Sequence, residues 1–306
     1  MNEINKETEY RRGVICVLAC QVMWGFLPLF WNAINPIDSW IIILYRIFTM
    51  FVFTVVAARF RYSWKEIFGP LADRNTRVKY FISGAILTAN WSIYIWAVTS
   101  GRVIQSAIGY YIEPLVICLF GIVLFKEKLT IYNGIAMALA LVAVIVILIY
   151  FGKLPGVALG LALTWATYSA IKKSSKLPAI IALVYETMVF AIIAIFAIIY
   201  IETQGIGGLS YNMPGKYALL FLTGLMTLIP VGLFGVAAPK VSLLLVGLMQ
   251  YISPTITLIC GITILGEDID FVQLAAFAII WVGLAFFTVG EVKTHRKQEQ
   301  AAITTE

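Results

Sequence analysis

The sequence YIEPLVICLFGIVLFKEKL, residues 111–129, returns 140 residues later as YISPTITLICGITILGEDI, residues 251–269. The two stretches are identical at six positions, including Pro114 and Pro254. The same offset pairs further residues with identical counterparts: Tyr45 with Tyr185, Phe81 with Phe221, Gly84 with Gly224, and Glu127 with Glu267. A constant offset across several segments indicates an internal repeat. The sequence therefore predicts two copies of one unit, each with a proline inside an apolar segment.

The composition is that of a membrane protein. Hydrophobic residues make up 61% of the chain, charged residues only 12%, and the mean hydropathy is +0.93. Soluble proteins carry about 25% charged residues, so we expect a polytopic membrane protein. The four cysteines lie in apolar segments without metal or disulfide spacing, and the single histidine, His295, lies in a polar tail. We expect no metal, no cofactor and no enzymatic activity.

Ten apolar segments are long enough to cross a bilayer as helices, which takes about 20 residues each. They cover residues 12–33, 38–60, 77–99, 103–125, 130–151, 155–173, 179–201, 215–237, 242–265 and 270–291. The predicted fold class is therefore all-α, with repeats at 12–151 and 155–291 and cytoplasmic tails without a defined fold at 1–11 and 292–306. Five spans per repeat is an odd number, so the second repeat enters the membrane from the opposite side and is inverted.

The distribution of positive charge predicts the orientation. If the amino terminus lies inside the cell, 18 of the 22 lysines and arginines fall on the cytoplasmic side. This bias predicts that both termini are cytoplasmic in a bacterial inner membrane, and it explains the net charge of +6 without a nucleic-acid partner. In residues 61–77, Trp64 and Phe68 recur at helical spacing beside basic residues, which predicts a short helix on the cytoplasmic surface.

Pro114 and Pro254 lie near the centres of the fourth and ninth predicted spans. Each proline removes the donor for the carbonyl four residues earlier, those of Tyr110 and Gln250, and bends the helix. A single proline is readily tolerated in a helix that faces lipid. Interrupted helices at matching positions of two halves, however, mark the binding site of many transporters. We therefore predict that both prolines act in gating.

Three charged residues fall inside predicted spans and away from the span ends: Arg46, Glu113 and Glu186. A charge near the bilayer centre costs about 2.5–3.5 kcal/mol on insertion scales, so each should face the bundle interior. One interpretation is an internal salt bridge between Arg46 and either Glu113 or Glu186. The other is that Arg46 holds a carboxylate of the substrate and that Glu113 is the residue that couples transport to protons.

Other polar and aromatic residues share helical faces with these charges. Trp24 and Trp91 lie too near the centre for an interfacial aromatic belt, whereas Trp31, Trp40 and Trp96 fit one. Each aromatic residue alone is more often packing than a ligand contact. The complete candidate set for substrate binding is Trp24, Arg46, Asn90, Trp91, Tyr94, Tyr110, Glu113, Tyr168, Gln250 and Ser253.

Taken together, these motifs resemble the EamA family of the drug/metabolite transporter superfamily. The repeat ending "EPL…G…LFKEKLT…G" matches the hallmark of that family, and GVICVLACQVMWGFLPLFW, the "YRI" of the second span and NWSIYIWAV…QSAIGYYIEP look like its RarD branch. The second repeat departs from the pattern, because Ser253 stands where Glu113 precedes the proline of the first. The resemblance implies export or exchange of amino acids, other metabolites or drugs without ATP.

We therefore expect a secondary transporter for small organic molecules that are amino-acid-like, aromatic or carboxylate-bearing. Transport would proceed by proton-coupled export or exchange through alternating access. The alternatives are a passive facilitator of the same substrates, a lipid flippase or a membrane scaffold that transports nothing. The expected partners are the substrate, the lipid bilayer and a coupling proton, and a monomer is favoured over an oligomer.

Overall fold

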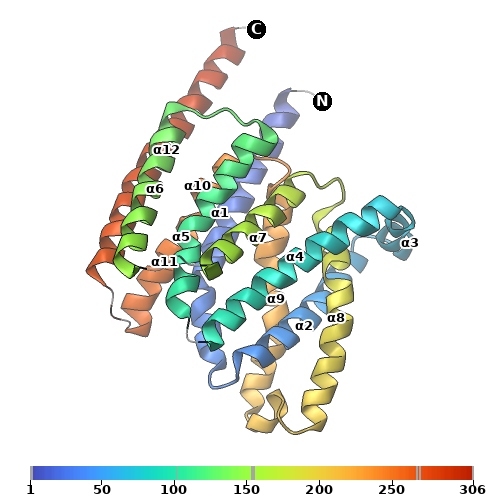
Figure 1. Cartoon of the computed structure of the whole chain (residues 1–306). Helices are drawn as coiled ribbons and strands as arrows, with labels where there is room; N and C mark the ends of the chain where they lie inside the picture. The colour runs from blue at the N-terminus through green and yellow to red at the C-terminus, as the bar shows by residue number, and fades with distance from the viewer. Residues whose placement is uncertain (1–2, 101, 153–155, 267, 269, 305–306) are drawn as a thin grey trace.

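The computed structural model describes residues 3–100, 102–152, 156–266, 268 and 270–304, and these form helices and turns without a β-strand. Glu267, the sequence counterpart of Glu127, lies outside the described residues. The helices, shown in Figure 1, are α1 (Glu3–Ile34), α2 (Ser39–Arg59), α3 (Trp64–Phe68), α4 (Arg74–Thr99), α5 (Val103–Phe125), α6 (Ile131–Phe151), α7 (Gly156–Lys173), α8 (Ala179–Thr203), α9 (Pro214–Ala237), α10 (Leu243–Gln250), α11 (Ile252–Cys260) and α12 (Phe271–Thr304).

Several helices begin at a serine or threonine whose side-chain hydroxyl accepts a backbone N–H of the first turn. The hydroxyl of Thr130 accepts the N–H of Asn133 at the start of α6, and Ser242 does the same for Leu245 at the start of α10. Glycine ends α6, because Gly152 adopts φ +63°, which side chains with a Cβ rarely adopt. These caps satisfy N–H groups that a helix end otherwise leaves unpaired.

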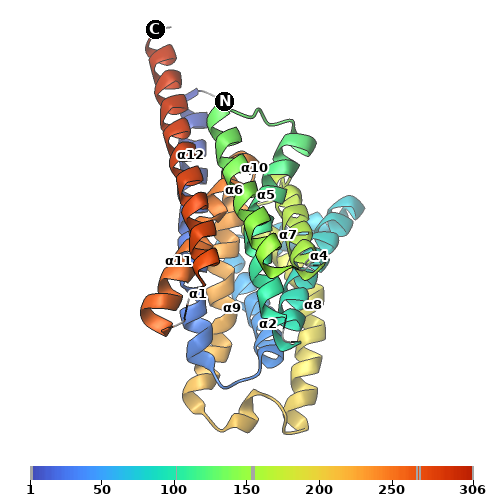
Figure 2. The ribbon, with the colours of Figure 1, turned by 60° about the vertical axis from the view of Figure 1, so that its left-hand side comes forward.

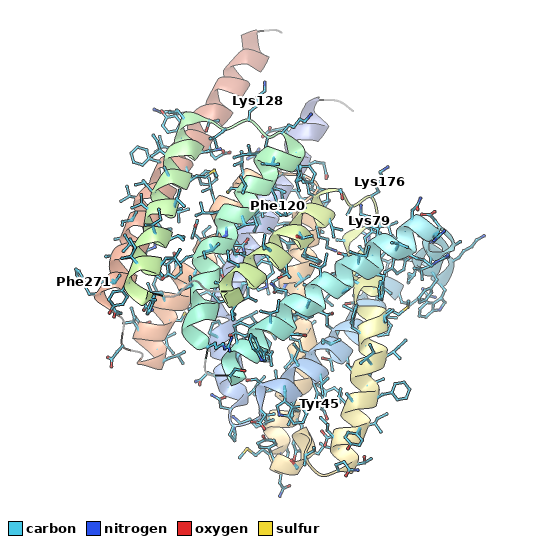
Figure 3. All side chains as sticks on the ribbon, in the orientation of Figure 1. Tyr45, Lys79, Phe120, Lys128, Lys176 and Phe271 are labelled. Atoms are coloured by element: carbon cyan, nitrogen blue, oxygen red, sulfur yellow. The ribbon has the colours of Figure 1, made fainter. Side chains whose placement is uncertain are left out.

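Eight stretches of the described residues are long and apolar enough to cross a membrane. Their outer surface carries side chains that a soluble protein would bury, such as Ile131, Ile149 and Phe196, each more than 65% exposed. Such extended apolar surface indicates contact with lipid, and Figure 3 shows it around the bundle. Helices α4 and α7 are less apolar because they carry polar residues that bond to neighbouring helices, among them Asn90 and Lys172.

The two proline segments differ in the structure. Helix α5 continues through Pro114 from Val103 to Phe125 without a break. The second segment is interrupted at Tyr251, between α10 and α11, three residues before Pro254. A proline inside a helix can be accommodated when neighbouring helices hold the segment. Helix α10 packs closely on α5, where Gly247 lies against the carbonyl of Pro114.

The same helix–helix contacts occur again when each helix is replaced by its counterpart in the other repeat, 140 residues away. Helix α4 packs on α7 and α8, and its counterpart α9 packs on α1 and α2. Helix α5 packs on α7, and the counterpart segment α11 packs on α1. Gly84 of α4 lies against the backbone of Glu186, and Gly224 of α9 lies against the backbone of Thr49 and Met50. The two glycines thus mark equivalent points where helices approach too closely for a Cβ.

Both termini lie at the same end of the molecule in Figures 1 and 2. Figure 3 places Lys128 and Lys176 toward that end and Tyr45 toward the other. The terminal segments are not the unstructured tails that we expected, because α1 begins at Glu3 and α12 continues to Thr304. Helix-forming Glu, Lys and Gln extend both helices, and the hydroxyl of Tyr10 on α1 donates to Glu291 on α12 at 3.1 Å.

The short helix predicted within residues 61–77 is confirmed in position. Helix α3 covers Trp64–Phe68, and Ser63 and Glu66 form a reciprocal capping box at its start. The hydroxyl of Ser63 lies 2.7 Å from Glu66, and this hydrogen bond lowers the pKa of the Glu66 carboxyl. The 3₁₀ turn η1 (Gly69–Ala72) follows, with Pro70 near its start, and joins α3 to α4.

Candidate functional site

Two polar groups lie inside the helix bundle, at equivalent depths from opposite ends. Arg46 lies seven residues after the first residue of α2, and Glu186 lies seven residues after the first residue of α8. We call the surroundings of Arg46 the Arg46 site and define it as Trp31, Arg46, Trp91, Tyr94 and Tyr110. We call the second group the Glu186 cluster and define it as Ser83, Tyr168, Lys172 and Glu186.

Aromatic rings surround the Arg46 guanidinium. Its Cζ lies 4.3 Å from the ring centroid of Trp91 and 5.4 Å from that of Trp31, within the range of cation–π attraction. Its Nε is buried and has no hydrogen-bond partner. Among the described residues, no carboxylate forms an ion pair with Arg46. The interpretation of an Arg46–Glu113 or Arg46–Glu186 salt bridge is therefore wrong, because both glutamates have other partners.

Two tyrosines complete the Arg46 site. The rings of Tyr94 and Tyr110 lie 6.4 Å apart between centroids, and both residues lie close enough to Arg46 to interact with its charge. Tyr110 is 45% exposed although it points toward α4. Leu119, a lipid-facing residue of the same helix, lies about half a turn around the axis from Tyr110. The exposed surface of Tyr110 therefore faces the bundle interior, so accessible surface remains beside the Arg46 site.

Glu113 and Gln250 meet where the two repeats touch. Gln250 Nε2 donates to Glu113 Oε1, and both side chains are buried. The side-chain amide oxygen of Gln250, Oε1, is buried and has no hydrogen-bond partner within the described part of the chain. Gln250 is the last residue of α10, so the Glu113 carboxylate is bound directly beside the interruption between α10 and α11. A proton gained or lost by Glu113 would therefore act directly on the joint between α10 and α11.

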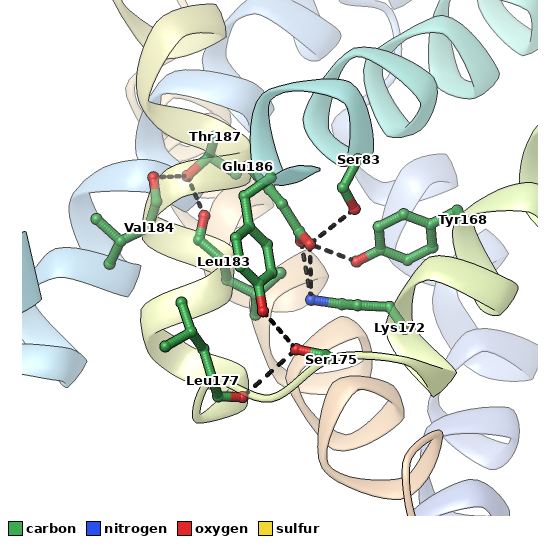
Figure 4. Close-up of polar contacts among 10 residues, drawn as sticks. Ser83, Tyr168, Lys172, Ser175, Leu177, Leu183, Val184, Glu186 and Thr187 are labelled. Carbon is green, nitrogen blue, oxygen red and sulfur yellow. Dashed lines mark hydrogen bonds and ion pairs between the residues drawn. The ribbon is translucent and has the colours of Figure 1, made fainter. Parts of the chain in front are cut away.

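The Glu186 cluster is closed and internally paired, as Figure 4 shows. Glu186 accepts hydrogen bonds from Lys172 Nζ at 2.9 and 3.0 Å, from Ser83 at 2.8 Å and from Tyr168 at 3.1 Å. All four residues are at most 1% exposed. The ion pair links α7 to α8, and Ser83 adds α4. The four hydrogen bonds leave neither charge without a partner, which a buried pair requires.

The structure does not bring all predicted site residues together. Asn90 does not present its amide to the Arg46 site, because its Nδ2 donates to the Leu161 carbonyl and to Thr164 of α7. Tyr168 belongs to the Glu186 cluster. Trp24 packs edge-on against Trp165, with centroids 5.3 Å apart. Ser253 lies half-buried on α11, and its backbone carbonyl faces Gly25 of α1.

Three contributing residues escaped the sequence analysis. Trp31 was assigned to the interfacial belt, yet it lies seven residues after Trp24 and thus on the same face of α1. Lys172 was counted only among the basic residues of the cytoplasmic side, although it stands four residues after Tyr168 on one helical face. Ser83 gave no signal, because a serine in a span commonly bonds to its own helix.

Equivalent positions of the two repeats differ in accessibility. Tyr94 is half-buried and Tyr110 is 45% exposed, whereas their counterparts Phe234 and Gln250 are buried, at 0% and 8% exposure. Arg46 likewise retains accessible surface, whereas Glu186 has almost none. The half of the bundle farther from the termini thus retains accessible surface around Arg46, whereas the half nearer the termini is closed around Glu186.

Comparisons with known proteins agree with this architecture. The model of the EamA-like transporter family matches residues 11–149 and again residues 155–289. The "Uncharacterized transporter YojE" of Bacillus subtilis is 34% identical over 95% of this chain and 98% of its own. "Protein RarD" of Streptomyces exfoliatus is 30% identical over 95% and 92%, and that of Escherichia coli is 29% identical over 94% and 97%.

A solved structure titled "Crystal structure of protein" superimposes with a TM-score of 0.71 at 15% identity, covering 90% of this chain and 97% of that one. At this identity the likeness concerns the fold alone. The relatives are transporters and not enzymes. The length of the two family matches and the identity to the relatives lead to one conclusion: the chain belongs to the EamA-like transporter family.

Proposed function

We propose that this protein is a secondary active transporter that moves small carboxylate-bearing organic molecules across the bacterial inner membrane by alternating access. The observation that carries the proposal is Arg46, a guanidinium inside a membrane span that no carboxylate of the described residues neutralises. An arginine at this depth is costly unless it is paired or reaches water. A site that binds an anionic substrate transiently needs such an unpaired cation.

The proposed architecture is ten spans in two inverted five-helix repeats, residues 12–151 and 155–291, with both termini cytoplasmic. Three observations support it. The family model matches twice over nearly these ranges, helix pairs recur under exchange of the repeats, and both termini lie at one end of the molecule. In this orientation the Arg46 site opens to the outside and the Glu186 cluster lies on the cytoplasmic side.

The Arg46 site suggests the chemistry of the substrate. The guanidinium presents a planar fork that matches a carboxylate, and its buried Nε has a hydrogen bond still to form. The rings of Trp31 and Trp91 offer flat apolar surface to an aromatic or aliphatic group. Amino-acid-like, aromatic or other carboxylate-bearing molecules satisfy both features.

Glu113 is the proposed coupling residue, and Pro254 is the proposed gating residue. The Glu113 carboxylate contacts Gln250 at the joint between α10 and α11, so a gained or lost proton changes the bond that holds this joint. Pro254 lies just beyond the joint and keeps the helix from closing into a continuous hydrogen-bonded rod. Pro114 lies in a continuous helix, and its part in gating is to present its carbonyl to Gly247 across the repeat interface.

Reconstitution into liposomes tests the proposal. Uptake of a panel of labelled amino acids and aromatic carboxylates should occur for at least one compound and should increase with an imposed pH gradient. Arg46→Gln should abolish uptake, whereas Arg59→Gln, at the other end of the same helix, should leave it unchanged. Glu113→Gln should retain exchange but lose accumulation. Uptake that ignores the pH gradient would identify a passive facilitator, and absence of uptake across the panel would refute the proposal.

A further inference from the structure

The Glu186 cluster is the closed counterpart of the Arg46 site. Glu186 and Arg46 stand at equivalent positions, 140 residues apart and seven residues inside α8 and α2. The ring of Phe234 stands where the first repeat has Tyr94, and it stacks on Tyr168 with centroids 6.2 Å apart. Both places therefore combine charge with aromatic walls. They differ in that one is open and the other is filled by its own side chains.

The cluster also contains groups that could bind an anion. Lys172 is a buried cation whose two recorded hydrogen bonds both go to the Glu186 carboxylate. Trp165 is 6% exposed, and among the described residues its buried indole N–H has no hydrogen-bond partner. The Trp165 ring lies 5.3 Å from the ring of Tyr168, one helical turn away on α7. An ammonium and an unpaired N–H donor thus lie on the same face, as Arg46 and its unpaired Nε do in the open half.

We propose that the Glu186 cluster is the inner half of the transport path, an anion-binding site that opens to the cytoplasm. In the inward-open state Lys172 and the Trp165 N–H bind the carboxylate of the substrate. In the present state the carboxylate of Glu186 accepts the hydrogen bonds of Lys172 that the substrate carboxylate would otherwise accept. Glu186 keeps the hydroxyl donors Ser83 and Tyr168 when Lys172 turns to the substrate, so its charge is not left bare. The inference rests on the alternating access proposed above.

A purely structural ion pair would behave differently, because it would stay sealed. Cysteine accessibility distinguishes the two cases without a known substrate. In a variant whose native cysteines are replaced, Ser83→Cys is a nearly isosteric reporter inside the cluster, and Ser169→Cys on α7 is a second one. Ala140→Cys is the matched control, since Ala140 is equally buried but lies between α6 and α12 in a separate apolar core.

The probes are anionic sulfonatoethyl methanethiosulfonate and cationic trimethylammonioethyl methanethiosulfonate, applied to inside-out vesicles. We expect both to label Ser83→Cys while Ala140→Cys stays unlabelled. The ratio of anionic to cationic labelling rates should fall about tenfold when Lys172→Gln is introduced together with Trp165→Phe, because the cation and its neighbouring donor are then gone while the Glu186 carboxylate remains.

Protection of both reporters from labelling, at a level equal to Ala140→Cys, would overturn the inference, and so would a labelling ratio that ignores the substitutions. These results are independent of the uptake assay. If liposomes show transport while both reporters stay protected, the inner site fails and the proposed function stands. If no compound of the panel is transported, the proposed function fails whatever the reporters show.

Discussion

Replacing one member of the Lys172–Glu186 pair should lower the free energy of unfolding far more than replacing both members. The pair is 1% and 0% exposed at its side chains, so water screens it little. Lys172→Met removes two charge-assisted hydrogen bonds of 2.9 and 3.0 Å and leaves the Glu186 carboxylate with only hydroxyl donors. At about 1.5–3 kcal/mol for each bond to a charged group, the loss is about 3–6 kcal/mol. This agrees with the roughly 3–5 kcal/mol found when one partner of a buried pair is removed.

The double variant Lys172→Met with Glu186→Gln leaves no unpaired charge and should lose less than about 1 kcal/mol, since neutral replacements of a buried pair are often tolerated. The assay is equilibrium unfolding of the purified protein in mixed micelles, arranged as a double-mutant cycle. Lys216→Met is the control, because Lys216 donates to the Ala33 carbonyl from an exposed position. A coupling energy below about 1 kcal/mol would refute the assignment of Lys172 and Glu186 as a buried, mutually dependent pair.

Three further outcomes are expected. Arg46→Lys should reduce uptake at least about tenfold while the protein stays folded, because an ammonium cannot reproduce the planar fork; unchanged uptake kinetics would remove Arg46 from the site. Pro254→Ala should impair transport more than Pro114→Ala, since only the second proline segment is interrupted; equal effects would speak against gating at the joint. Gly224→Ala should cost about 1–3 kcal/mol in the unfolding assay, whereas Gly156→Ala, where a Cβ would meet nothing, should cost little.

The sequence was sufficient to predict the helical segments, because apolar runs of spanning length carry a strong signal. The offset that pairs Gly84 with Gly224 reappears as two matching helix contacts, a role for these glycines that the sequence analysis did not predict. The interruption beside Pro254 was predictable from the missing N–H donor. The continuity of α5 through Pro114 was not, because it depends on neighbouring helices.

The partners of the charged residues could not be read from the sequence. Arg46, Glu113 and Glu186 were recognised as intramembrane charges, but which side chains meet depends on the relative rotation of packed helices. Lys172 was counted only among the basic residues of the cytoplasmic side, whereas the structure places it in the last turn of α7, against Glu186. The terminal segments were misjudged for a similar reason, since polar composition alone does not show that α1 and α12 continue.

The most direct test of the account is the accessibility of position 110 from outside the cell. Tyr110→Cys, in a background without native cysteines, should react with a membrane-impermeant thiol reagent applied to intact cells. The reaction should slow when a transported carboxylate from the liposome panel is added, because the ligand covers the Arg46 site. Labelling that occurs only from the cytoplasmic side of inside-out vesicles would contradict the proposed orientation. Labelling from outside that no transported compound slows would contradict the assignment of this site to the substrate.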